Sequence, residues 1–166
     1  MVNLYSLVAR LFYLHIMKQI TDRVAEIKVS YQPAISKKPI IKTALDAYNE
    51  LKEFYPIETI ALQEKFVAMY LNRANRVIGI YELSTGGITG TVADIRLILG
   101  VALKTASISI ILSHNHPSGN LQPSSADKML TQKIKDACTF LDISVMDHII
   151  VTPDGEYVSF ADEGWI

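Results

Sequence analysis

Two histidines and an aspartate stand close together where a buried strand would end and a helix would begin. His114 and His116 alternate directly after the apolar run 108–112, so in an extended segment their imidazoles lie on one side of the chain. Asp127 falls about one turn into the amphipathic segment that follows. Three nitrogen and oxygen ligands, with a fourth position left for water, are typical of a catalytic zinc site. The spacing therefore predicts a Zn²⁺ centre at His114, His116 and Asp127.

The same residues also fit a simpler interpretation without a metal. A pair of histidines in a loop can be solvated, and Ser124 with Asp127 has the S-x-x-D spacing of a helix-capping box. The two roles compete for Asp127, because we expect that a carboxylate bound to a metal cannot also close the box. His-x-His alone is weak evidence, whereas His-x-His, a Pro-Ser-Gly turn and an aspartate at this spacing are together much stronger.

Hydrophobic periodicity predicts the elements that must position these side chains. The order of strands and helices indicates the α/β (α+β) class, with a mixed β-sheet flanked by helices. In chain order we expect an amphipathic helix at 4–20, a strand at 23–31, a loop at 32–40, a helix at 43–54 capped by Thr43, a hairpin of strands 60–71 and 76–83, a helix at 94–105 capped by Asp94, a strand at 108–112, a helix at 124–141, and strands at 143–151 and 157–160. The inward faces of the last two helices are expected to carry Ile95, Ile98, Leu99, Ala102 and Leu103, and Ala126, Met129, Leu130, Ile134, Ala137 and Leu141.

Composition narrows the classes of function and the compartment. The chain has 166 residues, 49% of them hydrophobic, and a net charge of −1, so it is long enough for a real core and has no overall basic field to attract nucleic acid. Its single cysteine, Cys138, excludes an internal disulfide and a cysteine-based zinc cluster. We expect this thiol to be buried and the protein to be cytoplasmic.

The first twenty residues are apolar but interrupted. Arg10, His15 and Lys18 break the segment 4–20, which is too short and too polar for a membrane span and lacks the small-residue cleavage site of a signal peptide. We expect an amphipathic helix that packs on the domain or on a partner. A start at Met17 is an alternative, and His15 has no pattern that suggests a function.

At the metal-binding stretch the sequence resembles a known family. H-N-H-P-x6-S-x2-D, from His114 to Asp127, matches the JAMM (JAB1/MPN/Mov34) metalloprotease motif, and residues 62–160 are similar to bacterial RadC-like JAB-domain proteins. The shared stretches are LNRANRVIG, STGGITGT, LSHNHPSGNLQPS and DHIIVT. The resemblance implies a cytidine-deaminase-like JAB/MPN fold over 42–166, preceded by an N-terminal extension of helix, strand and loop at 1–41.

The resemblance also implies roles for single residues. His114, His116 and Asp127 become the zinc ligands, Ser124 a hydrogen-bond donor to the attacking water or the oxyanion, and Glu64 the general base. Without the family match, Glu64 reads as a surface carboxylate beside Lys65, with Glu53 and Glu58 as equal candidates.

A second family stretch, Asp147-His148, has two interpretations. It could hold a metal ligand in place, or it could make ordinary hydrogen bonds at a strand end, and we favour the second. Two departures from the family are visible. Nothing in this sequence resembles the helix-hairpin-helix region of longer RadC proteins, and Asp94-Ile95-Arg96 stands where relatives have a proline-containing helix start.

The predicted function is a zinc-dependent metallohydrolase whose activated water attacks an amide carbonyl in a peptide or isopeptide substrate. The alternatives are a non-catalytic MPN-type binding module and a RadC-like protein associated with DNA repair. The charge and the missing helix-hairpin-helix region argue against nucleic acid, and the family association keeps it open. A nucleobase deaminase would need a P-C-x-x-C pair, which a chain with one cysteine lacks.

Overall fold

The computed structural model describes Gln32, residues 38–86 and residues 93–166. The helix predicted at 4–20 and the strand predicted at 23–31 lie outside the described residues, as does most of the loop predicted at 32–40. The domain boundary predicted at residues 41 and 42 stays a prediction. Within the described residues, no helix combines the length and the apolar character needed to cross a bilayer.

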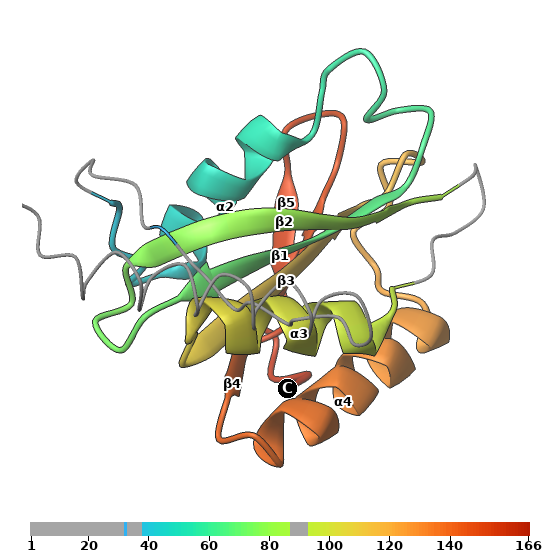
Figure 1. Cartoon of the computed structure of the whole chain (residues 1–166). Helices are drawn as coiled ribbons and strands as arrows, with labels where there is room; N and C mark the ends of the chain where they lie inside the picture. The colour runs from blue at the N-terminus through green and yellow to red at the C-terminus, as the bar shows by residue number, and fades with distance from the viewer. Residues whose placement is uncertain (1–31, 33–37, 87–92) are drawn as a thin grey trace, which may run out of the picture. The chain divides into compact units, whose positions relative to one another are not determined.

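A five-stranded sheet forms the centre of the domain, with the strand order β2-β1-β3-β4-β5 (Figure 1). The parallel pair β3–β4 stands among antiparallel neighbours. This arrangement confirms the predicted mixed sheet and the α+β class. The strands are β1 (Lys65–Leu71), β2 (Val77–Thr85), β3 (Ser109–Asn115), β4 (Ser144–Val151) and β5 (Tyr157–Ser159).

Helices cover both faces of this sheet (Figure 1). On one face lies α2 (Ala44–Leu51), which continues into a 3₁₀ turn at Lys52–Phe54. On the other face α3 (Ile95–Thr105) and α4 (Ser125–Thr139) lie side by side. The predicted caps are confirmed, since the side chains of Thr43, Asp94 and Ser124 accept from the first-turn N–H groups of their helices.

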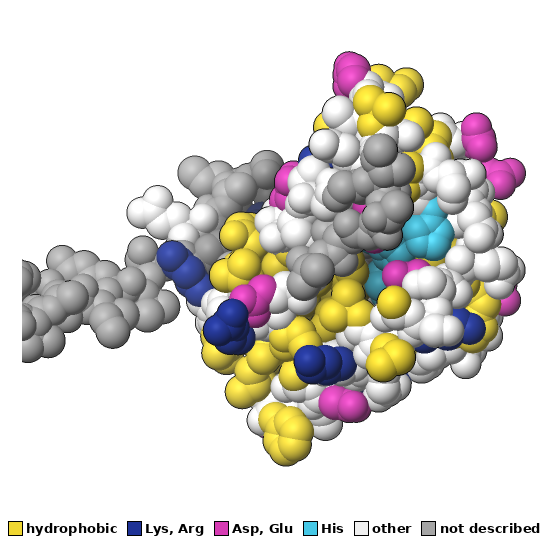
Figure 2. Space-filling view, turned by 90° about the vertical axis from the view of Figure 1, so that its right-hand side faces the viewer, with side chains coloured by type: hydrophobic (Ala, Val, Ile, Leu, Met, Phe, Trp, Pro, Cys, Tyr) yellow, Lys and Arg dark blue, Asp and Glu magenta, His cyan; other side chains and the backbone are white. Residues whose placement is uncertain are grey.

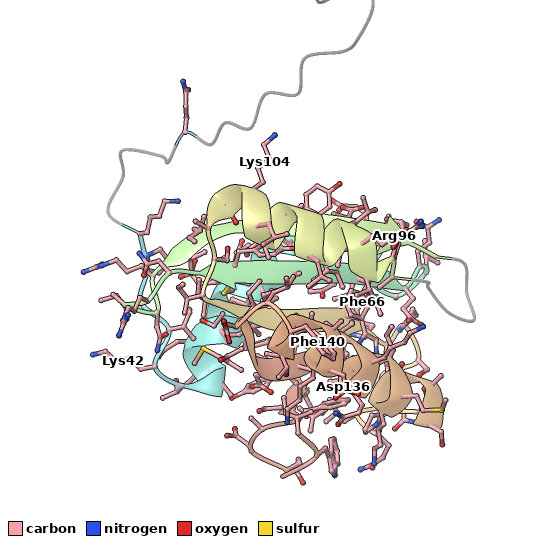
Figure 3. All side chains as sticks on the ribbon, turned by 60° about the horizontal axis from the view of Figure 1, so that its bottom comes forward. Lys42, Phe66, Arg96, Lys104, Asp136 and Phe140 are labelled. Atoms are coloured by element: carbon pink, nitrogen blue, oxygen red, sulfur yellow. The ribbon has the colours of Figure 1, made fainter. Side chains whose placement is uncertain are left out.

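Each sheet face has its own apolar core, as strand alternation requires. Between the sheet and α2 the buried residues include Tyr48, Leu51, Val67, Met69, Ile111 and Ile149. Between the sheet and the pair α3–α4 they include Phe66, Ala68, Ile98, Ala102, Leu112, Ile134 and Cys138. The second core is the one that reaches the predicted metal ligands. Figure 3 shows Phe66 at the level between α3 and α4, whereas Lys104 points outward from α3.

The predicted strand at 60–71 was wrong in its first part. Residues 57–62 form turns, in which Ile60 N–H donates to the carbonyl of Pro56, and β1 begins only at Lys65. The apolar residues in this segment suggested a strand. Instead, the carbonyls of Ile60 and Gln63 accept hydrogen bonds from the side chain of Asn115, and the segment stays outside the sheet. Glu64 consequently lies directly before β1 and not inside a strand.

The inward helix faces were predicted only in part. Ile98, Ala102 and Ile134 are fully buried as expected. Leu103, Met129 and Leu141, by contrast, are 59%, 73% and 39% exposed, and Ala126 is exposed as well. On α4 the buried positions are Thr131, Ile134 and Cys138. The polar residue Thr131 is thus buried in the core, whereas Met129, which the apolar pattern predicted to be buried, is exposed. The prediction that Cys138 is buried is confirmed.

Candidate metal centre

The two histidines stand at the carboxyl end of β3, which extends further than the predicted 108–112. His114 is the penultimate residue of the strand and is 1% exposed, and His116 follows the strand directly. The ring of His114 stacks against that of Phe66, with 5.9 Å between the ring centroids. The Nε2 atoms of His114 and His116 are 2.9 Å apart. The extended backbone therefore brings both imidazoles to the same side, as the spacing predicted.

Asp127 joins them from the first turn of α4. Its Oδ1 lies 3.5 Å from Nε2 of His114, and its Oδ2 lies 3.6 Å from Nε2 of His116. Among the described residues, these three side chains form a group whose ligand atoms are all within 4.8 Å of one another and could hold a metal ion. Figure 2 shows histidine side chains at the surface of this face with an acidic side chain beside them, so the group is accessible from outside.

The expected competition between capping and metal binding at Asp127 does not arise. The box is closed by Oδ2, which accepts from the N–H and the Oγ–H of Ser124, both at 2.7 Å. The N–H of Asp127 in turn donates to Oγ of Ser124 at 3.1 Å. Oδ1 takes no part in the box and points toward His114. A carboxylate has two oxygens. Here Oδ2 caps the helix and lies near His116, while Oδ1, outside the box, faces His114.

Each histidine is held through the ring nitrogen that faces away from the centre. Nδ1 of His116 is 2.5 Å from the carbonyl oxygen of Asn120, which can only accept, so this nitrogen carries a proton, and in the neutral ring the lone pair is on Nε2. Nδ1 of His114 is 2.7 Å from Nε2 of His148. Orientation through the remote nitrogen is the usual arrangement for a histidine that binds a metal.

The prediction for Asp147-His148 was right for Asp147 and wrong for His148. Asp147, inside β4, makes ordinary hydrogen bonds at the end of β5, accepting from the hydroxyl of Ser159 at 2.7 Å and from the N–H of Ala161 at 3.0 Å. His148 is fully buried and contacts the predicted ligand His114 directly. Side chains alternate along β4, so neighbouring residues face opposite sides of the sheet and take different roles.

Electrostatics favour an ionised Asp127 and a neutral His148. Burial alone would raise the pKa of Asp127, but contacts with His114, His116 and Ser124 hold that pKa well below its usual range. Burial opposes protonation of His116, yet the neighbouring Asp127, the Asn120 carbonyl and the charge of Glu64 together raise its pKa. Burial, reinforced by His114, holds the pKa of His148 well below its usual value.

Glu64 lies at the edge of this group, brought there by strand pairing. Phe66 pairs with His114 across β1 and β3, and the antiparallel direction places Glu64 alongside His116. The charge of Glu64 acts on the pKa of His116, which is consistent with this placement. Of the three glutamates considered from the sequence, Glu64 is the one that the register brings to the histidines.

Asn115, between the two histidines, was not singled out from the sequence. Its carboxamide is buried on the opposite face of the sheet and makes three hydrogen bonds to the segment that carries Glu64. Oδ1 accepts from the N–H of Lys65 at 2.7 Å, and Nδ2 donates to the carbonyls of Ile60 and Gln63 at 2.7 and 2.9 Å. The residues on both sides of Glu64 are therefore anchored to the metal-binding strand.

Comparison with known proteins agrees with this geometry. The profile of the RadC-like JAB domain matches residues 40–165. The chain belongs to the RadC-like JAB domain family. It is similar to a UPF0758 protein of Flavobacterium johnsoniae, with 43% identity over 130 residues, which cover 78% of this chain and 55% of that protein. A UPF0758 protein of Porphyromonas gingivalis is 37% identical over 141 residues, or 85% of this chain and 62% of that protein.

This chain spans less than two-thirds of the length of either relative. The matched region contains the whole candidate metal centre, since Glu64, His114, His116, Ser124 and Asp127 all fall inside residues 40–165. The family match and the convergence of two imidazoles and a carboxylate together place this domain in a JAMM-like superfamily with a group of side chains that could hold a metal ion.

Proposed function

We propose that this domain is a zinc-dependent hydrolase of amide bonds, with a peptide or an isopeptide as substrate. One observation carries the proposal. The Nε2 atoms of His114 and His116 are 2.9 Å apart, and Oδ1 of Asp127 lies 3.5 Å from Nε2 of His114. All three atoms can donate an electron pair. Such an arrangement is repulsive unless a cation or a proton lies between the donors.

The donor set supports zinc as that cation. Two neutral imidazole nitrogens and one carboxylate oxygen match the borderline character of Zn²⁺, and three protein ligands leave a fourth position for water or substrate. When bound, a zinc ion polarises an amide carbonyl and lowers the pKa of a water molecule to about 7.

Glu64 is the proposed proton carrier. Its carboxylate accepts the proton of the attacking water and returns it to the leaving amine nitrogen. Two features support this role: the register that brings Glu64 alongside His116, and the anchoring of its neighbours by Asn115. A base that is fixed relative to the ligands needs no reorganisation before it takes the proton.

Ser124 is the proposed donor to the oxyanion. In the structure its hydroxyl proton goes to Oδ2 of Asp127, so stabilising an oxyanion requires the hydroxyl to rotate away from that bond. Oδ2 keeps its second donor, the N–H of Ser124, and the helix cap survives the rotation. The hydroxyl can thus serve the cap at rest and the oxyanion during the reaction.

Metal analysis with matched variants tests this function. The wild type is expected to hold one zinc per chain after purification in zinc-containing buffer, and His116→Ala is expected to hold none. Glu64→Gln is expected to keep the metal and to lose hydrolysis. Glu58→Gln, at an exposed glutamate in the same region, is the control that should keep both.

Because the substrate is not identified, hydrolysis is measured on a complex mixture of peptides and on isopeptide-linked peptides, with new amines detected by mass spectrometry. A wild type without stoichiometric zinc would refute the proposal. A zinc-loaded wild type that cleaves none of these substrates would favour the non-catalytic binding module. Cleavage that survives Glu64→Gln undiminished would remove Glu64 as the base.

A further inference from the structure

A chain of buried hydrogen bonds runs from His114 through two side chains that the proposed chemistry does not use. Nδ1 of His114 is 2.7 Å from Nε2 of His148, and Nδ1 of His148 is 2.6 Å from Oγ1 of Thr131. The hydroxyl of Thr131 donates to the backbone carbonyl of Asp127 at 2.6 Å. The chain thus begins on one candidate ligand, in β3, and ends on the backbone of another, in α4.

This hydrogen-bond relay, from His114 through His148 and Thr131 to the carbonyl of Asp127, is buried among apolar side chains. His114 is 1% exposed, and His148 and Thr131 are 0% exposed. The ring of Phe66 packs against His114 and edge-on to His148, and Phe160 stacks on the other side of His148, with 4.6 Å between the centroids. In such surroundings a polar group without a partner is destabilising, so each bond of the relay constrains the next.

The direction of the relay determines which nitrogen of His114 has a lone pair. The carbonyl of Asp127 can only accept, so the single proton of Thr131 goes there and Oγ1 accepts from Nδ1–H of His148. Nε2 of His148 then accepts from Nδ1–H of His114. In this direction Nε2 of His114 is unprotonated and faces the centre. In the opposite direction a proton would occupy that nitrogen and block it as a ligand.

We propose that Thr131 and His148 are positioning residues that hold His114 in its metal-binding tautomer and fix its distance from Asp127. The inference rests on the metal site of the proposed function and deepens it. Neither residue touches the metal or the substrate. They act through His114, and the link to the Asp127 carbonyl ties the strand ligand to the helix that carries the third ligand.

Thr131→Val is the decisive variant, since valine has nearly the same shape and lacks the hydroxyl. Without the hydroxyl as acceptor, the Nδ1–H of His148 has no partner, which favours the tautomer with its proton on Nε2. That proton is donated to Nδ1 of His114, so the proton of His114 moves to the metal-facing Nε2. Loss of such an outer hydrogen bond weakens metal binding by roughly 10- to 100-fold. Thr131→Ser keeps the hydroxyl and is expected to restore an affinity close to that of the wild type.

Zinc affinity is measured by competition with a chromophoric chelator, and Co²⁺ absorption reports the geometry of the site. Thr139→Val is the matched control: Thr139 lies on the same helix, its hydroxyl makes the same kind of bond to the carbonyl four residues earlier, and it is exposed. This control should leave both readouts unchanged. Thermal unfolding in excess chelator checks that each variant is folded.

His148→Leu and His148→Gln form a second pair, which decides the question if Thr131→Val does not fold. Leucine removes both bonds, and glutamine keeps an acceptor for His114 and a donor for Thr131, so only the leucine variant should lose affinity. Equal zinc affinity within either pair would overturn the inference while leaving the proposed function intact. A wild type that binds no zinc would overturn the proposed function and, with it, the inference.

Discussion

Asn115→Asp tests the anchoring of the Glu64 segment with almost no change in side-chain shape. The Asn115 carboxamide uses its one acceptor and both of its donors on Lys65, Ile60 and Gln63. Aspartate keeps the acceptor for the N–H of Lys65 and lacks both donors. The variant also places a negative charge against the two carbonyl oxygens that had been hydrogen-bonded.

The expected loss of stability follows from these bonds. Two carbonyls that lose their donor cost about 1–3 kcal/mol each, so the free energy of unfolding should fall by about 2–6 kcal/mol. A cavity of about 240 Å³, lined by Asn115, Lys65 and Gln63 among others, lies beside the side chain. Water entering it can solvate the carbonyls and the carboxylate, which favours the lower half of the range.

The measurement is equilibrium unfolding in urea at neutral pH with a chelator present, so that metal binding does not mask the change. Asn120→Asp is the matched control, because Asn120 is exposed and its side chain only accepts, from the N–H of Gln122 at 2.9 Å. It should lose less than about 0.5 kcal/mol. If Asn115→Asp were equally mild, the three hydrogen bonds would not hold the segment, and Asn115 could not be what positions Glu64.

Three further predictions concern the scaffold of the site. Thr43→Ala removes the acceptor of the Asp46 N–H and opens the capping box of α2. The free energy of unfolding, measured in urea, should fall by about 1 kcal/mol. Burial raises the pKa of the Cys138 thiol to about 11, so a thiol reagent at pH 8 should modify the native protein far more slowly than the urea-unfolded chain. Burial holds the pKa of His148 well below 6.5 in the fold, so between pH 6.5 and 5 only the unfolded state takes up its proton. The metal-free protein should lose stability over that interval by up to about 1.4 kcal/mol per pH unit, and His148→Gln should remove this slope. The raised pKa of His116 acts in the opposite direction, because the folded state takes up that proton at a higher pH than the unfolded chain. The part of the slope that belongs to His148 is therefore the difference between the wild type and His148→Gln.

The ligands could be predicted from the sequence because their spacing matches the period of the elements that carry them. His114 and His116 share a side in any extended segment, and Asp127 follows Ser124 at the spacing of a helix start. All three lie within a stretch of fourteen residues, and the structure brings their side chains together. Glu64, by contrast, is fifty residues away, and only the family resemblance selected it among neighbouring glutamates.

The residues that hold the ligands could not be predicted in the same way. Thr131 occupies a core position of α4, where the apolar pattern pointed to Met129, because its hydroxyl is satisfied by His148 and by a helix carbonyl. His148 reaches His114 only because β3 and β4 are parallel and adjacent. Pairing between strands that are distant in sequence sets these contacts, and no local periodicity encodes that pairing.

The capping box and the metal centre are one structure in this domain. Ser124 fixes Oδ2 of Asp127 through two hydrogen bonds, so the carboxylate is oriented by the start of α4 before any ion arrives. The same helix supplies Thr131, whose hydroxyl reaches His148 and through it His114. The first two turns of α4 therefore orient the helix ligand through its side-chain cap and the strand ligand through the relay. A serine followed three residues later by aspartate is common at helix starts. What makes it part of a metal site here is the strand end at its side, which presents two imidazole nitrogens to the carboxylate that the cap orients.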